Sequence, residues 1–218
     1  MALIKSISGI RGTIGGRTDD NLTPLDTVKF TSAYGAWLLK ENPGKDRLRV
    51  VVGRDARISG PMIHALVTAT LSGMGIDVID LGLSTTPTVE MMVVHHQADG
   101  GIILTASHNP KQWNALKLLN RQGEFLDAEQ GAEILRTAQA DDYTYAEVDR
   151  LGTITSDLEG IDRHIEKVLA LPAVDRRAIA EAGFKVVVDA VNSTGGIAIP
   201  KLLRALGVTD ITELNCTP

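Results

Sequence analysis

Ser107 is the residue of this 218-residue sequence best suited to act as a nucleophile, because polar and basic residues surround it in the chain. The apolar run 101–104 precedes it, which predicts that the serine leaves the end of a buried strand. A phosphoserine carries about two negative charges and three acceptor oxygens, and it needs donors and cations around it. Ser107 has such neighbours, so its setting suits a carrier of a phosphoryl group. These neighbours are an imidazole, an amide, a turn-forming proline and two lysines: His108, Asn109, Pro110, Lys111 and Lys117.

A second group of charged residues, Arg54, Asp55 and Arg57, follows an apolar run at 48–52. We interpret these three residues as an ion-pair network that supports a loop, with direct contact to a substrate phosphate as the alternative. Arg11 lies in a glycine-dense stretch, 9–16, that lacks the Gly-Lys-Ser/Thr ending of a P-loop. This stretch is expected to form a turn whose N–H groups face a phosphate. Arg11 could also simply pair with a carboxylate there.

Strand-like and helix-like segments alternate along the chain, which favours helices packed on both faces of a sheet. The fold class expected is a three-layer α/β/α domain with a mixed, largely parallel sheet in residues 1–152. The incomplete start of a second, similar α/β domain is expected in residues 153–218. The expected strands are 48–52, 76–81, 101–104, 114–120, 185–189 and 211–214, and the expected helices begin near residues 24, 60, 87, 128, 160 and 196.

Helix starts are marked by capping residues. Thr23, Pro24 and Asp26 have the spacing of a capping box with proline at the first helical position. Ser59 and Asp127 are expected to cap two further helices.

Composition limits the partners. The net charge of −5 argues against a nucleic-acid partner held by phosphate neutralisation. Cys216 is the only cysteine, so no internal disulfide can form, as is common in a reducing compartment. No apolar run approaches the roughly 20 residues of a membrane span, and the first residues do not resemble a signal peptide. These features predict a cytoplasmic protein with no membrane partner.

Four segments together resemble the α-D-phosphohexomutases, the family of phosphoglucomutase, phosphomannomutase and phosphoglucosamine mutase. These segments are Ser8–Gly12, Gly53–Arg57, Thr105–Pro110 and Asn114–Lys117. The segment 188–196 is similar to the opening of the family's second domain, although Ser193 stands where the family usually has glycine. The resemblance implies an isomerase that interconverts hexose 1-phosphate and 6-phosphate through a phosphoserine and a hexose 1,6-bisphosphate.

The resemblance also implies roles for single residues. Ser107 would carry the phosphoryl group, Lys117 would act in proton transfer, and Arg11 would be an active-site arginine. His108 would orient the serine or the substrate, and Asn109 and Lys111 would support the loop or its charge.

The family also implies a Mg²⁺ ion bound by the Ser107 phosphate and an aspartate-rich loop. No Asp-x-Asp-x-Asp pattern occurs here, so the remaining ligands are expected beyond Pro218. The partners expected are a phosphosugar and C-terminal domains of the same chain, with self-association of the incomplete domain. The 218 residues alone are expected to be inactive. Whether the hexose is glucose, mannose or glucosamine stays open.

Other functions are weaker candidates. A serine hydrolase would need an oriented base and an oxyanion hole, and Ser107 lacks the Gly-x-Ser-x-Gly elbow. A non-catalytic phosphosugar-binding or assembly module stays open. His95 and His96 are interpreted as helix-end residues rather than metal ligands. The 192–196 loop is interpreted as a tight turn, with an anion site as the alternative.

Overall fold

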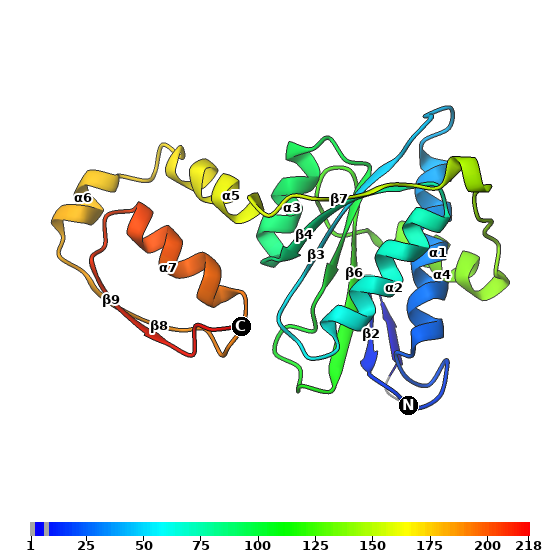
Figure 1. The fold of residues 1–218 in the computed structure, drawn as a ribbon, viewed down its shortest axis with the longest axis horizontal. Coiled ribbons are helices and arrows are strands. Elements are labelled where there is room, and N and C mark those ends of the chain that lie inside the picture. Colours follow the sequence, from blue (N-terminus) through cyan, green and yellow to red (C-terminus); the bar gives the residue numbers. More distant parts are fainter. Residues whose placement is uncertain (1–2, 7–8) are drawn as a thin grey trace.

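The computed structural model describes residues 3–6 and 9–218, and Figure 1 shows their arrangement. The strands are β1 (Leu3–Ser6), β2 (Gly9–Thr13), β3 (Arg49–Arg54), β4 (Asp77–Leu83), β5 (Gly100–Leu104), β6 (Trp113–Leu119), β7 (Ile154–Ser156), β8 (Lys185–Asp189) and β9 (Asp210–Leu214). The helices are α1 (Pro24–Glu41), α2 (Gly60–Gly73), α3 (Thr86–His95), α4 (Ala128–Ala140), a 3₁₀ turn η1 (Val148–Arg150), α5 (Gly160–Leu169), α6 (Arg176–Glu181) and α7 (Gly195–Ala205).

The main sheet has seven strands in the order β1-β2-β6-β5-β3-β4-β7. Strands β5, β3, β4 and β7 pair in parallel, whereas β6 is antiparallel to both β5 and β2. Strand β2 therefore runs in the same direction as the parallel group, and only β1 and β6 run against it. This mixed, largely parallel sheet confirms the expected fold class.

Two hydrophobic layers lie on opposite faces of this sheet. One contains Phe30 and Leu38 of α1, Val67 of α2 and Ile134 of α4, packed against Val50 and Val52 of the sheet. The other layer packs α3 against the sheet through Val89, Met92 and Val93, which meet Val51 and Ile103. Since neighbouring residues of a strand point to opposite faces, the unbroken run Val50–Val52 supplies both layers. Helices therefore cover both faces of the sheet, which gives the three layers α/β/α.

Helix α1 begins where its capping residues predict. The backbone N–H of Asp26 donates to the Thr23 hydroxyl, and the Asp26 carboxylate accepts from the Thr23 backbone N–H, which completes a capping box. Farther along, the hydroxyl of buried Tyr34 donates to the carbonyl oxygens of Leu119 at 2.7 Å and Gly101 at 3.2 Å. Burial raises the pKa of Tyr34 well above its ordinary value, so the hydroxyl stays a donor and fixes α1 to β5 and β6.

The residues after β7 form a separate, thinner region. Helices α5, α6 and α7 accompany a two-stranded parallel sheet of β8 and β9 (Figure 1). Strand β7 pairs with β4, so the main sheet extends to Ser156, beyond the boundary after residue 152 that the sequence predicts. The strand expected at 185–189 forms as β8, but of its apolar residues only Val188 is buried, and Val187 is 65% exposed.

Two local expectations from the sequence also need correction. The stretch 9–13 forms strand β2 rather than a turn, and a positive φ occurs at its first residue, Gly9, and again after the strand, at Gly15 and Gly16. Ser8, at the start of that motif, lies outside the described residues. Ser59 precedes α2 but makes no capping hydrogen bond; instead its hydroxyl accepts from the buried Asn114 amide at 2.9 Å. None of the helices described is long and apolar enough to cross a membrane.

Candidate functional site

A cavity of about 840 Å³ opens at the carboxyl ends of the parallel strands β3, β4 and β5. Ligands of open α/β sheets bind at this edge, because loops from neighbouring strands converge there. The loop after each of these strands lines the cavity, and so does the turn after β8, so both regions of the chain contribute. The lining segments are 55–58, 84–87, 105–111 and 191–194, together with Ile103.

Ser107 lies in the loop between β5 and β6, with an exposed side chain at the cavity wall. Its φ of 52° is in the left-handed region that non-glycine residues rarely adopt. The backbone N–H of Ser107 donates to the Thr105 hydroxyl at 3.1 Å, and that hydroxyl donates to Asp55 Oδ2 at 2.6 Å. A buried threonine thus connects the serine backbone to a fixed carboxylate, while Ser107 itself is exposed.

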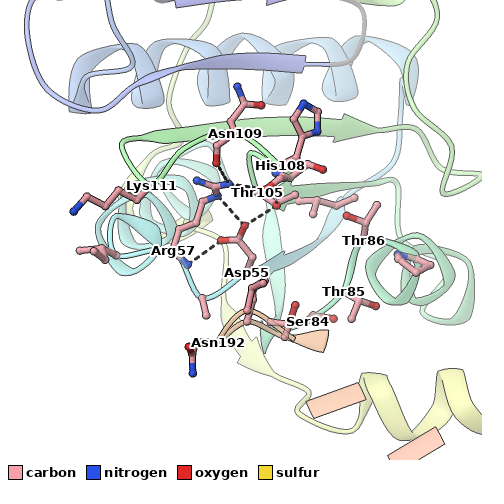
Figure 2. Close-up of a pocket in the computed structure, with 18 residues that line it drawn as sticks. Asp55, Arg57, Ser84, Thr85, Thr86, Thr105, His108, Asn109, Lys111 and Asn192 are labelled. Carbon is pink, nitrogen blue, oxygen red and sulfur yellow. Dashed lines mark hydrogen bonds and ion pairs between the residues drawn. The ribbon is translucent and has the colours of Figure 1, made fainter. Parts of the chain in front are cut away.

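Arg57 holds this loop from within. Figure 2 shows it between Asp55 and the loop that carries Asn109. Its Nη2 donates to the carbonyl oxygens of Ser107 and Asn109, each at 2.7 Å. Its Nη1 donates to the carbonyls of Pro110 at 2.9 Å and Trp113 at 3.0 Å. Its Nε donates to Asp55 Oδ2 at 3.1 Å.

These five acceptors match the five N–H donors of a guanidinium group. The Arg57 side chain is only 12% exposed, so a substrate phosphate would have to displace loop carbonyls to reach it. Asp55 is engaged as fully, since its carboxylate also accepts from the backbone N–H of Arg57 at 3.0 Å. The geometry of both residues therefore favours loop support over direct phosphate binding.

Arg54 lies apart from the cavity lining. Its Nη1 donates to the carbonyl of Asp55 at 3.2 Å, and its charge acts on Asp80 behind the loop. Burial on its own raises the pKa of Asp80, but the His64 hydrogen bond at 2.8 Å, the Gly82 N–H and the Arg54 charge outweigh it and lower that pKa. Arg54 is thus part of a network beneath α2, not of the wall around Ser107.

His108, Asn109 and Lys111 all line the cavity. His108 and Lys111 are exposed, and the backbone N–H of Asn109 closes a turn onto the carbonyl of Ala106 at 3.0 Å. The loop therefore presents an imidazole and an ammonium group on the same wall as the serine.

Arg11 and Lys117 are outside the cavity lining but share one face of the sheet. Arg11 of β2 is directly opposite Ala115 of β6, and Lys117 is two residues farther along β6. Directly opposite residues of antiparallel strands, and residues two apart on one strand, project to the same face. Lys117 is also opposite Ile103, which does line the cavity. Both cations therefore lie on the same face of the sheet as Ile103, outside the cavity lining itself.

Two side chains, Phe125 and Glu90, lie near Lys117. Its ammonium lies 5.6 Å from the centre of the Phe125 ring, within the range of a cation–π interaction. Burial raises the pKa of Glu90 on α3, and the charge of Lys117 opposes that increase. An aromatic face and a carboxylate thus flank the lysine proposed for proton transfer.

The fit to a metal ion is incomplete. Mg²⁺ prefers octahedral oxygen ligands, and the described residues contain no group of three or more His, Cys, Asp or Glu that could hold a metal. Asp55 already accepts hydrogen bonds from Arg57 and Thr105. His96, which we interpret as a helix-end residue, bonds Asp157 Oδ2 at 2.7 Å.

The sequence alone does not predict that three parts of the chain belong to the site: Thr105, Ser84 and the turn after β8. Thr105 was named only as part of a motif, and its hydrogen bonds depend on a fold that its sequence neighbours do not show. Ser84 is 3% exposed, lines the cavity, and its hydroxyl has no partner among the described residues. The 192–196 loop is expected to be a tight turn; a turn with left-handed φ at Val191 and Asn192 does form there, and residues 191–194 also line the cavity.

Comparisons with known proteins agree with this geometry. Residues 3–145 match the model of "Phosphoglucomutase/phosphomannomutase, alpha/beta/alpha domain I". The chain is 36% identical over 209 residues to a phosphoglucomutase/phosphomannomutase of Thermococcus kodakarensis, covering 95% of this chain and 44% of that protein. It is 33% identical to a phosphoglucosamine mutase of Alkaliphilus oremlandii, covering 100% of this chain and 46% of that protein.

A solved structure, a putative phosphomannomutase from Thermus thermophilus, superposes with a TM-score of 0.83 at 25% identity, covering 100% of this chain and 47% of that one. The chain thus spans less than half the length of these relatives. The sequence, the sheet order and the serine loop lead to one conclusion: this chain belongs to the phosphoglucomutase/phosphomannomutase family, the α-D-phosphohexomutases.

Proposed function

We propose that this chain supplies the phosphoryl-carrying half of an intramolecular phosphotransferase that moves phosphate between the 1- and 6-positions of a hexose. The observation that carries the proposal is Ser107, an exposed hydroxyl on the wall of the cavity, in a loop held by Arg57. The family and its named relatives support a phosphosugar as the substrate. The identity of the hexose is not part of the proposal, because the relatives act on different sugars by name.

The reaction has two balanced transfers. A hydroxyl oxygen of a hexose monophosphate attacks the phosphorus on Ser107, the new P–O bond forms, and the Ser107 Oγ–P bond breaks. The hydroxyl gives up its proton, for which Lys117 is the proposed relay, and a hexose bisphosphate results. After the intermediate reorients, Ser107 accepts the other phosphoryl group by the reverse chemistry. Because the group in transfer is already anionic, catalysis depends on positioning and on nearby cations.

In the proposal, Arg11, Lys117 and Lys111 supply those cations at the sheet face and on the loop, and His108 orients the serine or the substrate. In the proposal, Asn109 shapes the loop, while Asp55 and Arg57 hold it. Mg²⁺ is part of the proposal through the Ser107 phosphate only. The described carboxylates do not assemble a site for it, so no step is derived through the metal.

The decisive test compares two serines that line the same cavity, Ser107 and Ser193. Both Ser107→Ala and Ser193→Ala would be made in the protein as its gene encodes it. We expect Ser107→Ala to lose mutase turnover by several orders of magnitude and to lose phosphate from the intact mass. Ser193→Ala should keep both within about tenfold.

Normal turnover in the Ser107→Ala variant would refute the carrier role. Labelling of Ser107 by a fluorophosphonate probe, without phosphate uptake, would point to acyl transfer instead. The 218 residues on their own should show negligible turnover. Cytoplasmic location and self-association are further proposals, which cell fractionation and light scattering would test.

A further inference from the structure

We propose that Arg57 is a positioning residue that turns two backbone N–H groups of the serine loop, those of His108 and Lys111, into an anion site for the phosphoryl group on Ser107. This inference rests on the proposed function, and it assigns the loop backbone a role distinct from that of its side chains. The ligand class is a phosphate monoester dianion.

The first step is the direction of the carbonyl groups. Arg57 draws the carbonyl oxygens of Ser107, Asn109 and Pro110 to one guanidinium, at 2.7 to 2.9 Å. A loop whose carbonyls converge on one point has its peptide planes fixed. The cation also neutralises the partial negative charge of these oxygens, which would otherwise repel a phosphate.

The second step is peptide geometry. The described residues contain no cis peptide bonds, and in a planar trans peptide the N–H points opposite to the C=O. The partner of the Ser107 carbonyl is the N–H of His108, and the partner of the Pro110 carbonyl is the N–H of Lys111. Both N–H groups must therefore point away from Arg57. The Asn109 carbonyl has no such partner, because Pro110 lacks an N–H.

The third step is that these two donors are available. Neither the His108 nor the Lys111 N–H has an acceptor among the residues that the structure describes, whereas the Ser107 and Asn109 N–H groups are bonded to Thr105 and Ala106. Backbone N–H groups without acceptors in a left-handed turn are a recognised setting for anions. Both residues line the same cavity as Ser107.

The fourth step is the support beneath Arg57. Asp55 fixes the guanidinium through Nε and, through the Thr105 hydroxyl, the N–H of Ser107. The Asp55 carboxylate therefore fixes both the Arg57 side chain and the backbone of Ser107. The φ of Ser107, 52°, costs free energy unless such contacts hold it.

The test places phosphoserine at position 107 during translation, so that it does not depend on any activity of the chain. The second ionisation of the phosphate is then followed by ³¹P NMR titration. Hydrogen bonds to the dianion lower the pKa of the phosphate below its ordinary value of about 6. We expect Arg57→Lys to raise that pKa by about one pH unit relative to the parent, because lysine keeps the charge but cannot hold several carbonyls at once.

Arg54→Lys is the matched control, since Arg54 lies in the same segment but outside the cavity lining. It should leave the titration unchanged. Amide ¹H resonances of His108 and Lys111 should move downfield as the phosphate of the parent becomes dianionic, and should move less in Arg57→Lys. Thermal unfolding of each variant shows whether the fold is kept.

Identical titrations of the parent and a folded Arg57→Lys, with unmoved His108 and Lys111 amides, would overturn the inference. If Arg57→Lys does not fold, the parent amide shifts decide alone. The proposed function fails separately, through normal turnover in Ser107→Ala, so the two failures are distinguishable.

Discussion

Two strands with nearly the same sequence differ sharply in their surroundings. Strand β3 contains Arg49-Val50-Val51-Val52, and β8 contains Lys185-Val186-Val187-Val188. The three valines of β3 are fully buried, whereas Val187 of β8 is 65% exposed. The difference lies in the partners: β3 has strands on both sides and helices on both faces, while β8 pairs with β9 alone.

The two strands show that the local sequence predicts strand formation but not burial. A run of β-branched residues predicts a strand at both places, and both strands form. Burial, however, depends on neighbours that come from elsewhere in the chain. The main sheet, residues 3–156, is therefore expected to be the more stable region, and residues 157–218 are expected to open more readily.

The largest expected effect is the difference in unfolding free energy between two matched substitutions, Val51→Ala in β3 and Val187→Ala in β8. Val51→Ala removes buried methyl groups from the layer beneath α3 and should cost about 2–4 kcal/mol of unfolding free energy. Val187→Ala should change it by about 0.5 kcal/mol or less. Urea unfolding of both variants measures the contrast, and equal losses would show that the two regions share one core.

A smaller effect is expected at the junction of the two regions. Asp157 accepts hydrogen bonds from His96 at 2.7 Å and from Arg163 of α5. Asp157→Asn should weaken the attachment of α5 by about 1–3 kcal/mol, because a charged acceptor is lost. Glu159→Gln removes the exposed partner of Arg163 and should cost less than about 1 kcal/mol. Hydrogen exchange of the α5 amides measures both.

The same junction should respond to acid. Burial alone raises the pKa of Asp157, but the hydrogen bonds from Arg163 and His96 outweigh it and lower that pKa. A carboxyl group with a lowered folded-state pKa stabilises the fold above its unfolded value, about 4, and loses this contribution as the pH falls further. Attachment of α5 should therefore weaken below about pH 4, and Asp157→Asn should remove that dependence. An unchanged acid response in the variant would assign it to other groups.

The smallest effect should be a gain of stability. Val191 is 79% exposed and has a φ of 46°, a conformation that disfavours β-branched residues. Val191→Gly should stabilise the turn after β8 by about 1 kcal/mol, because glycine adopts this conformation without strain. Slower hydrogen exchange in β8 and α7 would show it. Val187→Gly, in extended backbone, should act in the opposite direction.

Much of the fold follows from local signals in the sequence. The Thr23–Asp26 capping box, the apolar run before Ser107 and the alternation of strands and helices are all readable, because each depends on neighbours in the chain. The strand at 9–13 was missed because its glycines suggest a turn, whereas its hydrogen bonds come from β6, about a hundred residues later. Ser59 was expected to cap α2 for a local reason, and a distant amide, Asn114, uses its hydroxyl instead.

Some residues of the candidate site can likewise be recognised from the sequence, whereas others are brought there only by the fold. Ser107 and its polar neighbours are recognisable as a linear motif, and family resemblance adds Arg11 and Lys117. The contacts of Arg57 with Pro110 and Trp113 join residues more than fifty positions apart, so spacing alone cannot reveal them. The participation of the 191–194 turn depends on how the second region meets the first, which no local pattern contains.

The saturation of Arg57 has a consequence for how the serine loop responds to its environment. A guanidinium group presents its N–H donors in a rigid, planar fork, so its partners are held in a fixed arrangement. All five N–H groups of Arg57 are already bonded to Asp55 and to loop carbonyls, so a carbonyl that turned away would leave a nearly buried donor unpaired. Residues 107–113 are therefore expected to shift together as one unit rather than residue by residue.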